Sequence, residues 1–181
     1  MTRKLIVPTL IGFILFLTIP ILYLANYSQT ITTEDQKVVY ELPYPGILPD
    51  HPLYFFKAIR DKILDFSTRD KLKKVDLYIL FSDKRARMAQ LLSDKGKMDQ
   101  AITTMSKSEK YFLKIPKLLI QSKEQGEAPK NELIDRVKAS NKKHREVIQE
   151  LLKTAPEGEQ YRITEILMIN ENSQNDLENL Q

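Results

Sequence analysis

The sequence predicts an all-α protein, an antiparallel helical bundle of about five helices behind a single N-terminal transmembrane helix. Residues 5–25 form an apolar run without one charged side chain. From residue 50 onward, apolar residues recur at three- and four-residue steps, the period of an amphipathic helix. No segment alternates apolar and polar residues as a half-buried strand does. At 181 residues the chain has room for one domain beside the membrane segment.

The apolar run at residues 5–25 is long enough to cross a membrane, since about 20 helical residues span a hydrocarbon core of about 30 Å. Arg3 and Lys4 precede this run. The positive-inside rule therefore keeps residues 1–4 in the cytoplasm as a short stub and places the chain from residue 26 onward outside the cell membrane.

Cleavage after the apolar run is not expected. Signal peptidase needs small side chains at the −1 and −3 positions, and a site ending at Ala25 would place Tyr23 at −3. We therefore predict an uncleaved signal anchor in a single-pass protein of the cell membrane, with the bulk of the chain extracytoplasmic.

A polar linker and a proline-rich strap, together residues 26–49, join the anchor to the helices. Three prolines fall within seven residues of the strap, namely Pro43, Pro45 and Pro49. Because proline fixes φ and pushes the preceding residue out of the α region, the strap is predicted to be stiff and extended. Asp50 is then expected to cap the first helix, with Pro52 in its first turn.

The helical domain is predicted at residues 50–170, with helices beginning near residues 52, 69, 97, 129 and 156. Ser67 to Asp70 resembles a capping box for the second helix. Pro116 should kink or break the third helix, and a short apolar piece at residues 118–120 follows it. Beyond Asn170 the composition becomes polar, so residues 171–181 are expected to fray as a tail.

The apolar stripes indicate which residues form the core. The second helix is apolar around much of its middle, which is typical of a helix contacted on several sides. Burial is expected for Val75, Ile79, Ile148 and Leu151. The first helix carries an apolar stripe of Leu53, Phe56, Ile59, Ile63 and Phe66.

The run from Gly46 to Lys57 reads Gly-Ile-Leu-Pro-Asp-His-Pro-Leu-Tyr-Phe-Phe-Lys, between the predicted anchor and long charged helices. In this combination the chain resembles the prokaryotic domain of unknown function numbered 5667. The likeness extends, more weakly, to about Asn170. It implies an exported helical domain in a membrane-anchored protein, and it brings no catalytic or binding residue with it.

Several kinds of chemistry have no support in the sequence. The chain has no cysteine, which excludes disulfides, thiolate metal sites and a cysteine nucleophile. Its two histidines, His51 and His144, belong to no metal-binding motif, and the single glycines form no phosphate-binding loop. We predict no catalytic, cofactor-binding or metal-binding residue. His144 lies on the inner stripe of its helix, where a structural role is favoured over a functional one.

The charge pattern leaves one candidate surface. Without Arg3 and Lys4, the 28 basic residues of the chain fall to 26 against 24 acidic ones, a balance that argues against nucleic-acid binding. Basic residues nevertheless gather on the second helix. The candidate contacts for anionic lipid or a cell-wall polymer are Lys71, Lys73, Lys74, Lys84, Arg85 and Arg87. The simpler interpretation is a solvated helix whose charges help to arrange the bundle.

Two classes of function stay open. The favoured one is a non-enzymatic extracytoplasmic module that binds or spaces partners in the cell envelope: another protein, anionic lipid or a cell-wall polymer. The alternative is a sensor of a small ligand or cation with a site between helices. A broad exposed apolar or aromatic surface would support the first class, and a convergent polar pocket the second.

Overall fold

The computed structural model describes residues 40–179. The predicted cytoplasmic stub, the signal anchor at residues 5–25 and the linker up to residue 39 lie outside the described residues. Within residues 40–179, no helix combines the length and the hydropathy that a membrane crossing requires.

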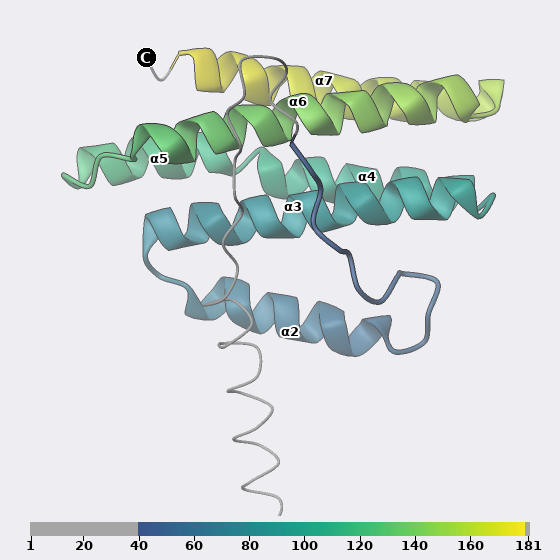
Figure 1. Cartoon of the computed structure of the whole chain (residues 1–181), viewed down its shortest axis with the longest axis horizontal. Coiled ribbons are helices and arrows are strands. Elements are labelled where there is room, and N and C mark those ends of the chain that lie inside the picture. Colours follow the sequence, from purple (N-terminus) through teal and green to yellow (C-terminus); the bar gives the residue numbers. More distant parts are fainter. Residues whose placement is uncertain (1–39, 180–181) are drawn as a thin grey trace, which may run out of the picture. The chain divides into compact units, whose positions relative to one another are not determined.

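The described residues form an all-α bundle without a β-strand, as predicted. Its elements are α2 (Tyr54–Ser67), α3 (Lys71–Asp94), α4 (Met98–Phe112), α5 (Ile115–Glu124), α6 (Asn131–Thr154), the 3-10 helix η1 (Glu157–Glu159) and α7 (Gln160–Glu178). Figure 1 shows them in layers, with α6 and α7 on one side, α3 and α4 in the middle and α2 on the other side.

The core lies where α3, α4, α6 and α7 meet. The four residues expected to be buried, Val75, Ile79, Ile148 and Leu151, are at most 2% exposed, which confirms the prediction. Helix α3 contacts α2, α4, α5 and α6. Its wide apolar middle therefore reflects neighbours on several sides.

Two predicted helix starts differ in detail from the structure. Leu53, not Asp50, occupies the N-cap position of α2. The Asp50 carboxylate instead binds two lysines of the α3–α4 turn, with its Oδ2 2.8 Å from Lys97 Nζ and 3.3 Å from Lys95 Nζ. At α3 the cap is Asp70, which accepts from the Lys73 amide at 2.7 Å. The first helix thus begins at Tyr54, two residues later than expected, and the Asp50 side chain binds these lysines.

The C-terminal half of the domain is more helical than expected. Pro116 lies in the first turn of α5, where its missing amide hydrogen costs no helical bond, so it starts a helix instead of kinking one. Helix α7 also passes Asn170 and runs to Glu178. Ser173 and Leu177 are buried, so this part of the expected tail belongs to the folded domain.

The strap was expected to end at residue 49, but the segment that joins it to α2 continues to Leu53. We therefore use the name strap from here on for Tyr40 to Leu53, which is packed against the helices and crosses α3 (Figure 1). Tyr40 is buried, and its hydroxyl donates to Asp83 of α3. The Pro45 carbonyl accepts from Lys57 of α2. The folded domain thus includes the strap and does not begin at residue 50.

Candidate functional site

Helix α2 presents an apolar stripe to solvent. We call this surface the α2 stripe, and it consists of Phe55, Phe56, Ile59, Ile63 and Phe66. Phe66 is 87% exposed, Phe55 64% and Phe56 61%. At 3.6 residues per turn the five side chains fall within an arc of about 100°. They expose roughly 600 Å² together, at about 200 Å² for each fully exposed large side chain. This area is at the upper end of the about 300 to 600 Å² that the largest apolar patch of a typical soluble monomer covers, and such patches are often functional.

The opposite face of α2 is polar and holds the helix to the bundle. Asp61 is buried, and its Oδ2 lies 3.2 Å from Arg85 Nη2 of α3. Asp65 accepts from the Tyr78 hydroxyl at 2.8 Å and lies 3.3 Å from Lys74 Nζ. We call these contacts the α2 clamp. They leave α2 inverted relative to an ordinary surface helix, since its two acids face the protein and its apolar stripe faces outward.

A second polar cluster is sealed inside the bundle. Asp83 of α3, Glu109 of α4 and His144 of α6 are all fully buried. His144 Nε2 lies 2.9 Å from Asp83 Oδ1, and its Nδ1 lies 2.8 Å from Glu109 Oε1. Burial alone would lower the pKa of His144, but the charge of Glu109 and the hydrogen bonds that the ring donates to both carboxylates raise that pKa to about 9. His144 is therefore a cation at neutral pH.

Neighbouring groups complete this cluster. Ser140 donates to Asp83 Oδ1 at 2.6 Å, and the Asn170 amide donates to Glu109 Oε2 at 3.1 Å. The Tyr40 hydroxyl donates to Asp83 Oδ2. Every carboxylate oxygen of Asp83 and Glu109 thus accepts a hydrogen bond. The cluster joins the strap to helices α3, α4, α6 and α7. We call it the buried network.

The buried network has the residue types of an acid–base site but not the access that such a site needs. Both ring nitrogens of His144 already face carboxylates, and the side chain has no contact with solvent. Within residues 40–179 no three acidic or histidine side chains are placed to hold a metal ion. The geometry therefore points to a structural role.

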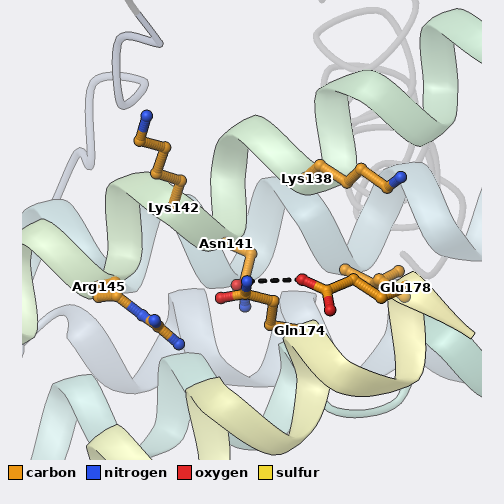
Figure 2. A pocket seen from close by; sticks show the side chains of 7 residues that line it. Lys138, Asn141, Lys142, Arg145, Gln174 and Glu178 are labelled. Atoms are coloured by element: carbon orange, nitrogen blue, oxygen red, sulfur yellow. Dashed lines mark hydrogen bonds between the residues drawn. The ribbon is translucent and has the colours of Figure 1, made fainter.

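A shallow pocket of about 390 Å³ lies between α6 and α7. Its lining residues are Lys138, Asn141, Lys142, Arg145, Gln174, Leu177 and Glu178. Figure 2 shows the amines of Lys138 and Lys142 pointing in different directions, while Gln174 binds Glu178 at 2.7 Å. The cations of this pocket do not converge on one point.

The six predicted contact residues do not form one exposed patch. Lys84 and Arg85 are buried, and Arg85 and Lys74 belong to the α2 clamp. Arg87 donates to Gln90 at 3.0 Å. Lys73 is exposed and Lys71 half-buried, both in the first turn of α3. A role in contact with an anionic surface stays a prediction.

Sequence reasoning missed the acidic members of the buried network. A signal was available, because Asp83 follows the buried Val75 and Ile79 at four-residue steps, and Glu109 follows Met105 in the same way. An acid on the buried stripe of a helix predicts an internal cationic partner. The apolar spacing of α6 predicts His144 on the buried face of the helix, and the structure confirms this position.

Comparison with known proteins identifies the family and nothing more specific. Neither curated proteins nor solved structures gave a significant match. A family model matches residues 46–158, which cover the end of the strap, helices α2 to α6 and the start of η1. The match spans more than half of the 181 residues. The chain therefore belongs to the family described as domain of unknown function 5667 (DUF5667).

Proposed function

We propose that this chain is a single-pass, membrane-anchored extracytoplasmic module without enzymatic activity, which binds or spaces components of the cell envelope. The α2 stripe carries the proposal. Leaving about 600 Å² of apolar surface in water is unfavourable, and covering that surface with a partner removes the cost. A docking role gives a reason for this arrangement.

Membrane attachment rests on the sequence. The charge-free run at residues 5–25 follows Arg3 and Lys4, the flank that the positive-inside rule keeps in the cytoplasm. The absence of enzymatic activity is part of the proposal and rests on the sequence, in which no catalytic motif is found. His144 has no exposed surface through which a substrate could reach it, and the exposed His51 belongs to no metal-binding motif.

The alternative, a sensor of a small ligand or cation, would use the pocket between α6 and α7. A ligand site needs polar groups that converge on the bound molecule. The lysine amines of this pocket diverge (Figure 2). We therefore favour docking through α2.

Attachment is tested on the full-length protein in its native membranes. We expect the protein to stay in the membrane fraction at full-length mass after carbonate washing. Protease added from outside should digest the domain. Recovery of a soluble fragment that lacks residues 1–25 would contradict the anchor.

Docking is tested by crosslinking from single cysteines, which the cysteine-free chain permits without background. A photocrosslinker on Phe56→Cys should give covalent adducts in native membranes. The matched control is Gln149→Cys on α6, which is also exposed. Equal labelling from the two sites would remove the evidence for a docking surface, and mass spectrometry of the adducts would identify the partner.

A further inference from the structure

We propose that the α2 stripe docks on the anionic lipid surface of the membrane that holds the anchor, so that α2 lies in the bilayer interface and the bundle rests against the membrane. This inference rests on the proposed function, because it assumes the anchor, and it deepens it by naming the partner. Three observations support lipid as the occupant.

The first observation is the charge pattern around the α2 stripe. Lys62 borders one edge of the apolar arc and Arg60 the other, at about 100° of rotation per residue. The two acids of α2, Asp61 and Asp65, lie on the opposite face in the α2 clamp. The guanidinium of Arg60 also lies 2.8 Å from Asp61 Oδ1, so Lys62 is the stronger cationic edge. The outward half of the helix is therefore apolar in the middle, with a basic residue at each edge and no acid. Interfacial helices on anionic bilayers share this distribution.

The second observation is the length of the tether. Tyr40 is fixed to the bundle by its bond to Asp83, and residues 26–39 separate it from the end of the apolar run. At about 3.5 Å per extended residue, this segment keeps Tyr40 within about 50 Å of the end of the anchor. Such a tether gives α2 a high effective concentration at the lipid surface, so weak contacts are enough for docking.

The third observation argues against a second copy of the chain. Because a basic residue borders each edge of the stripe, face-to-face pairing of two α2 helices brings basic side chains together. The pairing of Arg60 with Asp61 weakens the repulsion at one edge and leaves that of Lys62 at the other. An anionic bilayer offers apolar depth under the stripe and opposite charge at both edges.

The test uses full-length protein in vesicles of phosphatidylglycerol and phosphatidylcholine. An environment-sensitive NBD fluorophore is attached to Ile63→Cys or Phe66→Cys, with Gln149→Cys as the matched control. Emission from the stripe sites should shift to the blue, and nitroxide groups on the lipid acyl chains should quench it. The control site should keep the emission of a water-exposed label and escape quenching.

Two further variants separate the apolar and the charged contributions. Phe55→Ser with Phe56→Ser should abolish quenching at Ile63→Cys, and circular dichroism should show an unchanged fold because both rings are exposed. Lys62→Gln should weaken docking about fivefold on anionic vesicles, the expected effect of one cation near such a surface. On purely phosphatidylcholine vesicles the same substitution should have no effect.

The outcomes distinguish this inference from the proposed function. Protein that does not float with vesicles after carbonate washing contradicts the anchor, and with it the proposed function. Protein that floats while its stripe labels behave like the control overturns lipid docking and leaves the anchor intact. Disulfide crosslinking between two copies at Phe66→Cys, together with absent lipid quenching, would identify a second copy as the occupant and would also overturn the inference.

Discussion

The buried network makes the stability of the domain depend on pH in a direction that the structure fixes. The pKa of His144 is about 9 in the folded state, against 6.5 for an ordinary histidine. Between these values the folded protein holds a proton that the unfolded chain has released. The stabilisation is therefore complete below pH 6.5, and it is lost as the pH rises through about 9.

The expected size follows from the shift. One pKa unit corresponds to about 1.4 kcal/mol, so His144 should lower the free energy of unfolding by about 2 kcal/mol between pH 6.5 and pH 8. Above pH 8 a second group opposes this trend. Burial lowers the pKa of Lys57 to about 8, so the unfolded chain then binds more protons at that site and stability rises with pH. The interval from pH 6.5 to pH 8 therefore isolates the histidine.

The assay is urea denaturation of the fragment 40–181 at several pH values, followed by circular dichroism. The wild-type fragment and His51→Gln should both lose stability across the interval, since His51 is exposed and serves as the matched control. His144→Gln should be less stable at pH 6.5 by roughly 3 to 5 kcal/mol, the usual cost of breaking a buried ion pair, and should show a flat profile. A His144→Gln profile as steep as that of His51→Gln would refute the reasoning.

Three further predictions follow from the same contacts, each measured on the fragment 40–181. Tyr40→Phe should cost about 1 to 3 kcal/mol in urea denaturation, because the substitution removes a donor from the buried Asp83 carboxylate; no effect would contradict the packing of the strap. Leu177→Ala should cost roughly 2 to 5 kcal/mol while exposed Asp176→Ala stays within about 0.5 kcal/mol, and equal effects would mean that the end of α7 is not part of the core. Asp61→Asn should speed hydrogen exchange in α2 before that of α3, because the substitution breaks the ion pair with Arg85; unchanged exchange in α2 would rule out the α2 clamp as its main attachment.

The sequence predicts where the helices lie along the chain better than it predicts which face of each helix is buried. Apolar spacing placed α3 and α6 and four of their core residues correctly, because those helices bury the stripe that the pattern shows. In α2 the spacing was equally clear, but periodicity identifies an apolar face without saying what covers it. Which face of α2 lies against the bundle depends on the contact between Asp61 and Arg85, which are 24 positions apart in the sequence. Local patterns do not reveal such a pair.

The extent of the domain depends on similar long-range contacts. Asn170 was expected to be the last residue of the domain, yet its side chain is buried and donates to Glu109, 61 positions earlier in the chain, and α7 continues beyond it. Tyr40 looks like the end of a linker, yet it binds Asp83, 43 positions later. Both polar side chains are buried, and each donates a hydrogen bond to a carboxylate of the buried network. A composition-based boundary therefore excluded parts of the fold at both ends.

The charges of the α2 clamp determine which face of α2 lies against the bundle. Burying the α2 stripe against α3 would remove more apolar surface from water than the observed packing does, so hydrophobicity alone favours a helix rolled over by half a turn. That rotation would move Asp61 into solvent and leave Arg85 as a buried cation without its carboxylate, at a cost of several kcal/mol. The ion pair thus keeps the apolar face outward even though it adds little net stability. Its value lies in orientation, and the outward stripe is the part of the domain best suited to meet a partner.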